Sequence, residues 1–298
     1  MSRVETPETS GKRVLAIALA LLSLYVIWGS TYLVMRVALE TVPPFLMAGP
    51  RFLLAGVGMY AVLRMRGVKA PTREEWAASA KVGVLLLTFG NGAVAIAEQS
   101  VSSGVAAIVV GSMPIWAAFF ERVARGRSGQ SGHSGEWLGL LLGFVGVVLL
   151  NLGGGLALRG RGLVLLAAPT AWAAGSVWSK RLPLPAGPMA TATQMIVGGL
   201  SCLLLAWVTG ERFATTPSMR SILAMVYLTL AGSVIALTAY NWLLRNVRPA
   251  LATSYAYVNP IVAVFIGGVF GGERIGLLTI LAAAVSIAGV AIIASRRK

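Results

Sequence analysis

The sequence contains no aspartate, one histidine and one cysteine among its 298 residues. Ten glutamates are its only acids, and no Cys, His and Glu cluster has the spacing of metal ligands. The histidine, His133, lies in a Gly/Ser-rich stretch, and the lone Cys202 excludes an intramolecular disulfide. No G-x-x-x-x-G-K-[ST] motif, the phosphate-binding loop of many ATP-using proteins, is present, so we do not expect this protein to use ATP as an energy source. We therefore expect that the protein is not an enzyme and that it binds neither a metal ion nor a cofactor.

Charge of either sign is scarce. Only 12% of the residues are charged, against about a quarter in an ordinary soluble domain, whereas 57% are hydrophobic. Apolar stretches of roughly twenty residues recur along the chain, and each can cross about 30 Å of hydrocarbon as a helix. The pattern predicts an all-α integral membrane protein with ten transmembrane helices at about 14–38, 44–63, 76–97, 103–122, 136–152, 161–180, 187–208, 219–243, 249–270 and 275–294.

The basic residues predict the orientation. Seventeen Lys and Arg fall on the side of the two termini, and five fall in the opposite loops. The positive-inside rule then places both termini in the cytoplasm, in a bacterial inner membrane, with residues 1–12 as a tail before a retained first helix. Short basic clusters between apolar segments are typical of membrane-protein loops, so we expect no nucleic-acid partner despite the net charge of +15.

Two halves of the sequence resemble each other at a nearly constant offset. This predicts two repeats, 13–152 and 160–295, with five helices each. Because five is odd, the second repeat enters the membrane from the opposite face, as in many secondary transporters. The matching segments are Trp28–Arg36 over Trp172–Lys180, Val101, Ala106 and Pro114 over Val247, Ala252 and Pro260, and Gly146–Leu150 over Gly289–Ile293.

Specific motifs carry a resemblance to a known family. These are WGSTYLVMR, PPFLMAGPRF, EQSVSSGVAAIVVGSMPIW and, before the last helix, VFGGERIG. The chain resembles the drug/metabolite transporter superfamily in its ten-helix EamA-type form, and within it the aromatic amino-acid exporters. The resemblance implies that helices 1–4 and 6–9 surround a central cavity and that helices 5 and 10 are peripheral. The Gly-Glu-Arg mark is absent from the first half, where Arg127 stands at the position of Glu273.

Polar and aromatic residues in the middle of apolar helices are the candidates for the transport path. Trp28 and Trp172 occupy equivalent positions, either as core packing or as an aromatic wall. Asn91 belongs to a polar stripe on the third helix, which suits a cavity face or hydrogen bonds between helices equally. The expected substrate-binding set is Trp28, Thr31, Tyr32, Asn91, Met113, Trp116, Trp172, Ser176, Gln194, Tyr240, Asn241, Tyr257 and Asn259.

Four further residues have expected structural or gating roles. Arg51 lies about eight residues inside the second helix and needs a partner there, and Glu98 is the acid at comparable depth. We expect an ion pair between them, either as a permanent link or as a pair that breaks during transport. Pro114 and Pro260 are equivalent interior prolines, so the helices that contain them are candidate gates, with packing alone as the alternative.

These features predict a secondary transporter that exports amino acids, including aromatic and other neutral ones, and similar small metabolites. Its expected partners are a small-molecule substrate and the lipid bilayer, with no obligate protein partner. The alternatives are carriers of sugar phosphates, nucleotide sugars or drugs of the same superfamily, and a membrane receptor. Because Glu98 is the only acid that we expect at a depth comparable to that of Arg51, and Arg51 would hold it ionised, we expect exchange or facilitated transport without proton coupling.

Overall fold

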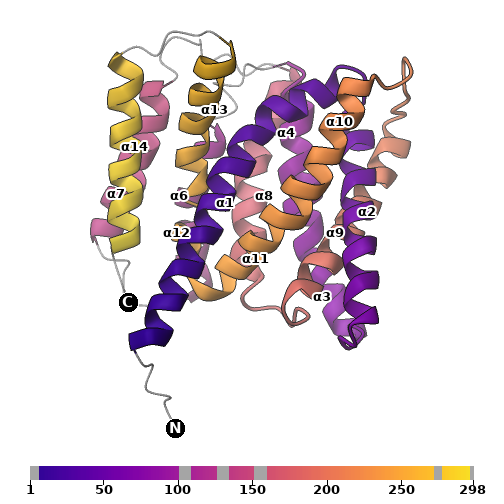
Figure 1. Cartoon of the computed structure of the whole chain (residues 1–298), viewed down its shortest axis with the longest axis horizontal. Coiled ribbons are helices and arrows are strands. Elements are labelled where there is room, and N and C mark those ends of the chain that lie inside the picture. The colour runs from indigo at the N-terminus through magenta and orange to yellow at the C-terminus, as the bar shows by residue number, and fades with distance from the viewer. Residues whose placement is uncertain (1–6, 101–108, 126–133, 151–159, 272–276, 296–298) are drawn as a thin grey trace.

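The described parts of the ten predicted segments are mainly helical in the structure, a computed structural model that describes residues 7–100, 109–125, 134–150, 160–271 and 277–295. The helices stand side by side as one bundle (Figure 1). In chain order they are α1 (Pro7–Leu39), α2 (Pro44–Met65), α3 (Arg73–Gly83) with η1 (Val84–Asn91) and α4 (Gly92–Ala97), α6 (Met113–Arg125), α7 (Ser134–Leu150), η3 (Gly160–Leu166) with α8 (Ala167–Trp178), α9 (Pro188–Val208), α10 (Met219–Tyr227) with η4 (Leu228–Ala236) and α11 (Leu237–Asn246), α12 (Pro249–Ala252) with α13 (Tyr255–Gly271), and α14 (Leu277–Ser295).

Some expectations fall outside the described residues. These are the start of the fourth predicted helix, the last residues of the fifth, the start of the tenth, the first six residues of the tail, and Arg127, His133 and Glu273.

Five helical stretches of the described chain are long and apolar enough to cross a membrane. Their outward side chains, such as Leu54 and Leu204, are large, apolar and exposed, which suits contact with lipid. α1 begins and α14 ends at the same end of the bundle, as an even number of crossings requires (Figure 1). The five stretches are Gly11–Leu39, Pro44–Met65, Arg73–Ala97, Pro188–Val208 and Met219–Asn246.

Equivalent helices of the two halves end in the same way. α2 is followed by Gly67 with φ of 80°, and α9 is followed by Gly210 with φ of 69°. The left-handed conformation lets the next amide turn back, so Val68 N donates to Leu63 O and Glu211 N donates to Ala206 O. The two glycines occupy equivalent positions of the sequence repeat.

The repeats meet at a self-complementary contact between α2 and α9. A Cβ atom at Gly56 would lie 2.7 Å from the Ile196 nitrogen, and one at Gly199 would lie 2.6 Å from the Leu53 nitrogen. In the sequence repeat, Gly199 is the counterpart of Gly56, and Ile196 is the counterpart of Leu53. Each glycine therefore makes the contact that its counterpart makes in return, which is the signature of a two-fold axis.

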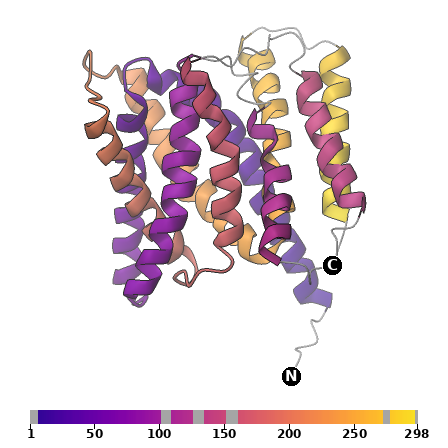
Figure 2. The ribbon, with the colours of Figure 1, turned by 180° about the vertical axis from the view of Figure 1, so that it is seen from behind.

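α7 and α14 form a second contact of the same kind at the edge of the bundle (Figures 1 and 2). A Cβ atom at Gly146 would lie 2.6 Å from the Ser286 nitrogen, and one at Gly289 would meet the Gly143 nitrogen. Gly289 is the repeat counterpart of Gly146, and Ser286 is that of Gly143. The chain is thus built of two inverted repeats of five helices, with the fifth and tenth helices at the periphery.

Two of the bundle helices are irregular at places that the sequence pattern does not reveal. η1 and η4 are π-helical, and they begin at Val84 and Leu228, which are equivalent positions in the third and eighth helices. Pro114 is the second residue of α6, where its missing N–H is without cost, and Pro260 is the sixth residue of α13. Whether either proline acts as a gate stays a prediction.

Candidate functional site

A cavity lies at the centre of the bundle and is lined by both repeats. Its volume is about 70 Å³, so a bulky solute requires the wall side chains to move. The first repeat contributes Trp28, Thr31, Tyr32 and Met35 of α1, Arg51 and Phe52 of α2, Leu87, Gly90 and Asn91 of η1, Val94 of α4, and Val110 and Met113 of the fourth helix. The second repeat contributes Ala168 and Trp172 of α8, Gly232 of η4, Leu237 of α11, and Tyr255 and Asn259 of α13.

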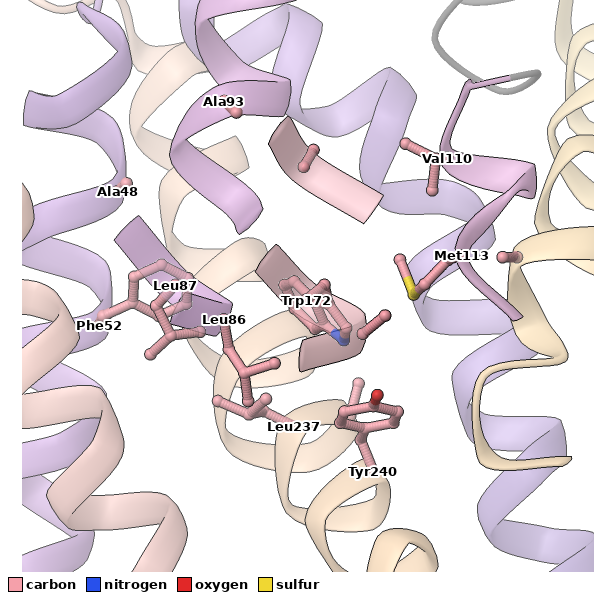
Figure 3. Close-up of a cluster of buried hydrophobic side chains, with 14 of the residues drawn as sticks. Ala48, Phe52, Leu86, Leu87, Ala93, Val110, Met113, Trp172, Leu237 and Tyr240 are labelled. Atoms are coloured by element: carbon pink, nitrogen blue, oxygen red, sulfur yellow. The ribbon is translucent and has the colours of Figure 1, made fainter. Parts of the chain in front are cut away.

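Four aromatic rings from four helices form a cluster at this cavity. The Trp28 ring lies 5.5 Å from the Trp172 ring, 5.3 Å from the Tyr240 ring and 4.7 Å from the Tyr255 ring, measured between centroids. Edge-to-face and tilted contacts at these separations are the favourable geometries for aromatic pairs. Figure 3 shows Trp172 between Met113 on one side and Leu86 and Leu87 on the other, within the buried apolar cluster.

Hydrogen bonds fix the orientation of three of these rings. Trp28 Nε1 donates to the Gly232 carbonyl at 3.1 Å, and Tyr255 Oη donates to Met113 Sδ at 3.2 Å. The Tyr240 and Ser176 hydroxyls are hydrogen-bonded to each other, behind the cavity wall. The cluster is therefore a packed, largely apolar surface made jointly by the two repeats.

The π-helical segments bring backbone to the cavity from both halves. Gly90 and Asn91 lie at the end of η1, and Gly232 lies inside η4. A Cβ atom at Gly90 would lie 2.6 Å from the Trp172 ring, so the ring rests directly on this backbone. π-helical turns inside α-helices are frequent at functional sites because they expose backbone groups and rotate the residues that follow.

Arg51 is the cation of the cavity wall. Its side chain is 4% exposed, and Nη2 donates to Asn91 Oδ1 at 2.7 Å. The guanidinium carbon lies 4.3 Å from the centroid of the Phe52 ring, which is a favourable distance for a cation over an aromatic face. Arg51 Nε has no hydrogen-bond partner among the described residues. The cavity thus has an apolar aromatic wall and one cationic polar group.

The predicted ion pair between Arg51 and Glu98 is not formed in the described part of the chain. Arg51 bonds to Asn91, and Glu98 Oε2 is buried with no hydrogen-bond partner among the residues that the structure describes. Asn91 precedes Glu98 by seven residues, about 10 Å along a helix, so the two side chains lie about two turns apart. Asn91 of η1 therefore takes the place beside Arg51 that the sequence analysis assigned to Glu98.

Seven of the thirteen predicted substrate-binding residues line the cavity, as does Arg51, which was predicted only as a structural or gating residue. Among them, Thr31 Oγ1 donates to the Trp28 carbonyl, whereas Asn259 Oδ1 is buried and finds no partner in the described ranges. The seven residues are Trp28, Thr31, Tyr32, Asn91, Met113, Trp172 and Asn259.

Three of the other six hold helices together. Asn241 Nδ2 donates to Gln194 Oε1 and to Thr191 Oγ1, each at 3.0 Å, which links α11 to α9. Tyr257 Oη donates to the Leu140 carbonyl at 2.9 Å, so its ring faces α7. These hydrogen bonds give Asn241 Nδ2, Gln194 Oε1 and Tyr257 Oη partners within the bundle, as buried polar atoms require.

The last three are Trp116, Ser176 and Tyr240. Trp116 is 38% exposed and packs against Phe119 and Phe120 of its own helix. Ser176 also donates to the Trp172 carbonyl, so together with Tyr240 it supports the aromatic cluster from behind. Their predicted contact with substrate is not supported by this geometry.

Tyr255 is the residue of the aromatic cluster that the sequence reasoning missed. It is 3% exposed and completes the aromatic cluster. Asn259 lies four residues later and so shares its helix face, whereas Tyr257 is two residues away and points elsewhere. The four-residue spacing from Asn259 is the signal that could have identified this tyrosine.

The polar groups of the cavity wall suit non-covalent recognition. They include the guanidinium of Arg51 and the amides of Asn91 and Asn259, beside an apolar aromatic surface. The described residues hold no group of three or more His, Cys, Asp and Glu that could bind a metal ion.

Comparisons with known proteins agree with this architecture. The model of the EamA-like transporter family matches residues 15–152 and 161–295. The inner membrane transporter YedA of Escherichia coli is 44% identical over 276 residues, which cover 92% of this chain and 89% of that protein. The transporter YdfC of Bacillus subtilis is 28% identical and covers 89% of this chain and 86% of its own.

More distant relatives share the fold. A chloroplastic WAT1-related protein of Arabidopsis thaliana is 25% identical over 91% of this chain and 67% of its own length. A crystal structure at 20% identity superposes with a TM-score of 0.75 and covers 93% of this chain and 95% of that one.

Proposed function

The chain belongs to the EamA-like transporter family, and on that premise we propose that it is a secondary transporter that exports amino acids, aromatic and other neutral ones included, and similar small metabolites. The observation that carries the proposal is the central cavity, which both repeats line and which combines an aromatic wall with a single cation among its described residues. A site at the junction of inverted repeats can open to either side when the repeats exchange conformations.

The composition of the cavity wall favours amino acids over phosphorylated solutes. A phosphate carries up to two charges and calls for several converging Arg or Lys side chains. Of the described residues that line the cavity, Arg51 alone is basic, whereas Trp28, Trp172 and Tyr255 supply apolar surface. One cation beside an aromatic wall matches a solute with one carboxylate and an apolar side chain.

The same wall favours transport without proton coupling. Proton-driven carriers need a titratable group that is reached alternately from both sides. No Asp, Glu or His is among the described cavity-lining residues, and Glu98 lies at the end of α4, beside them in sequence but not in the wall. We therefore propose exchange, or facilitated export down the cell's own concentration gradient.

The proposed location is a bacterial inner membrane with both termini in the cytoplasm. YedA is an inner membrane transporter, and the excess of basic residues on the side of the termini supports the orientation. Cysteines introduced into the tail and into the loop after α9, labelled by a membrane-impermeant reagent in intact cells, test it. Labelling of the tail and not of the loop would reverse the orientation.

Efflux from proteoliposomes tests the substrate class. Vesicles are loaded with single labelled amino acids, with a sugar phosphate or with a cationic drug, and protein-free vesicles are the control. We expect accelerated efflux of neutral amino acids only. Efflux of the drug or of the sugar phosphate, with every amino acid retained, would contradict the proposal and support another branch of the superfamily.

A further inference from the structure

Arg51 has a capacity for hydrogen bonding that the described residues do not use. A charged side chain inside a membrane-spanning helix is costly unless it meets a partner, and the described chain offers it a neutral amide and an aromatic ring. Asn91 Oδ1 accepts from Nη2, which leaves Nε buried and without a described partner at the cavity. A guanidinium donates in a planar fork, and its best acceptor is a carboxylate.

Two further polar atoms of the same cavity, Asn259 Oδ1 and Trp172 Nε1, are buried with no partner among the described residues. Asn259 Oδ1 is an acceptor on a side chain that is 1% exposed. Buried polar groups in folded proteins nearly always have partners, so an open donor and an open acceptor at one cavity need an explanation. Their complement is a ligand with acceptor oxygens at one end and an N–H donor.

We propose that Arg51 binds the carboxylate of the transported solute, with Asn259 Oδ1 accepting from its ammonium group and with Asn91 as the residue that positions the guanidinium. The cargo is then a zwitterionic α-amino acid whose apolar side chain packs on Trp28 and Trp172. This inference rests on the proposed function and adds the atoms that recognise the cargo.

The positioning role of Asn91 follows from its geometry. It is the last residue of η1, and its side-chain oxygen holds Nη2 at 2.7 Å while the Phe52 ring lies against the guanidinium face. These two contacts orient the guanidinium and leave Nε without a described partner, available to donate to a ligand. A carboxylate at Arg51 would also neutralise the buried charge, which makes the loaded cavity less costly than the empty one.

The first experiment needs no variant. Counterflow of labelled L-phenylalanine and L-leucine into proteoliposomes is measured with the amino acid, its amide or its deaminated acid as competitor. The amide lacks the carboxylate charge, so we expect it to compete at least about 30-fold more weakly, because a buried charged donor then keeps no acceptor. Amides that compete as well as the amino acids would overturn the proposal.

Variants of the two side chains provide the second experiment. Arg51→Gln should abolish the preference for the amino acid over its amide, and Arg51→Lys, which keeps the charge but loses the fork, should retain only part of it. Asn91→Ala leaves Arg51 in place and should also reduce the preference. The matched control is Arg64→Gln on the same helix, because Arg64 is exposed and donates to the Val68 carbonyl.

A loss of transport alone does not support the assignment of Arg51 to the solute carboxylate, since Arg51→Gln can lower the amount of folded carrier. The supporting result is a change in the ratio between amino acid and amide, normalised to folded protein from size-exclusion chromatography. An unchanged ratio in both Arg51→Gln and Asn91→Ala would contradict the assignment.

Failure of the proposed function has a different outcome. If wild-type protein exchanges deaminated acids such as 3-phenylpropionate but no amino acid, and Arg51→Gln removes that exchange, the amino-acid assignment is wrong and the carboxylate site stands. If the wild-type protein exchanges amino acids and their amides equally well, the proposed function is supported and the carboxylate site at Arg51 is contradicted.

Discussion

The pseudo-two-fold contact between α2 and α9 leads to a prediction about helix packing. Gly199→Ala places a Cβ atom 2.6 Å from the Leu53 nitrogen and 2.9 Å from the Gly49 oxygen, where ordinary contact begins near 3.4 Å. Both neighbours are backbone atoms, so no side-chain rotation can relieve the overlap. The helices must separate, and overpacking of this kind costs about 1–3 kcal/mol.

Gly58→Ala on α2 is the matched control, because a Cβ atom there meets nothing within 4 Å. In an exposed helix, alanine is preferred to glycine by about 1 kcal/mol. The propensity gain applies to both alanine variants, so they should differ by the overpacking cost, about 1–3 kcal/mol in unfolding free energy, with Gly58→Ala the more stable. At about 2–4 °C per kcal/mol, the midpoints should lie at least about 2 °C apart.

Thermal unfolding in mild detergent, followed by tryptophan fluorescence, measures this difference. Gly56→Ala should behave like Gly199→Ala, because its Cβ atom would lie 2.7 Å from the Ile196 nitrogen in the mirrored contact. The double variant should lose less than the sum, since one separation relieves both overlaps. Equal midpoints for Gly199→Ala and Gly58→Ala would refute the close contact.

The remaining predictions concern the cavity, a helix cap and energy coupling. Trp172→Ala should lower amino-acid counterflow at least about 10-fold, while Trp76→Ala, which removes an equal ring outside the cavity, leaves it near wild type. Equal losses of counterflow in the two variants, each normalised to the amount of folded protein, would contradict the cavity assignment. Glu211 accepts from Phe45 N at 2.9 Å at the start of α2, so Glu211→Ala should lower stability by about 0.5–2 kcal/mol in a detergent melt, and an unchanged midpoint would show that the cap is not needed. Counterflow should not respond to an imposed proton gradient, and a response that is lost in Glu98→Gln would make that acid the coupling residue.

The sequence predicts the span pattern and the repeat because both depend on properties of whole segments. Hydropathy over about twenty residues indicates the helices, and the repeat offset pairs Gly56 with Gly199 and Gly146 with Gly289. That these glycines lie at the contacts between repeats follows from the two-fold axis, which a duplicated sequence of opposite topology generates.

Which residues of a helix face the cavity was harder to predict, because successive side chains point about 100° apart around the helix axis, so a shift of one residue changes the face. The chain turns at Thr253 and Ser254 before α13 begins, and this sets Tyr255 toward the cavity and Tyr257 toward α7. Likewise, the π-helical η1 changes the rotation of the residues around it and brings Asn91, not Glu98, to Arg51. Neither irregularity has a signal in periodicity or composition.

Counterflow of a labelled neutral amino acid tests the central claim most directly. Proteoliposomes loaded with unlabelled L-phenylalanine are diluted into a trace of the labelled form, with protein-free vesicles beside them. A carrier that alternates access predicts a transient accumulation of label above its external concentration, which vanishes when the interior holds no amino acid. Saturable binding of label without accumulation, for every neutral amino acid tried, would contradict the assignment as an amino-acid transporter.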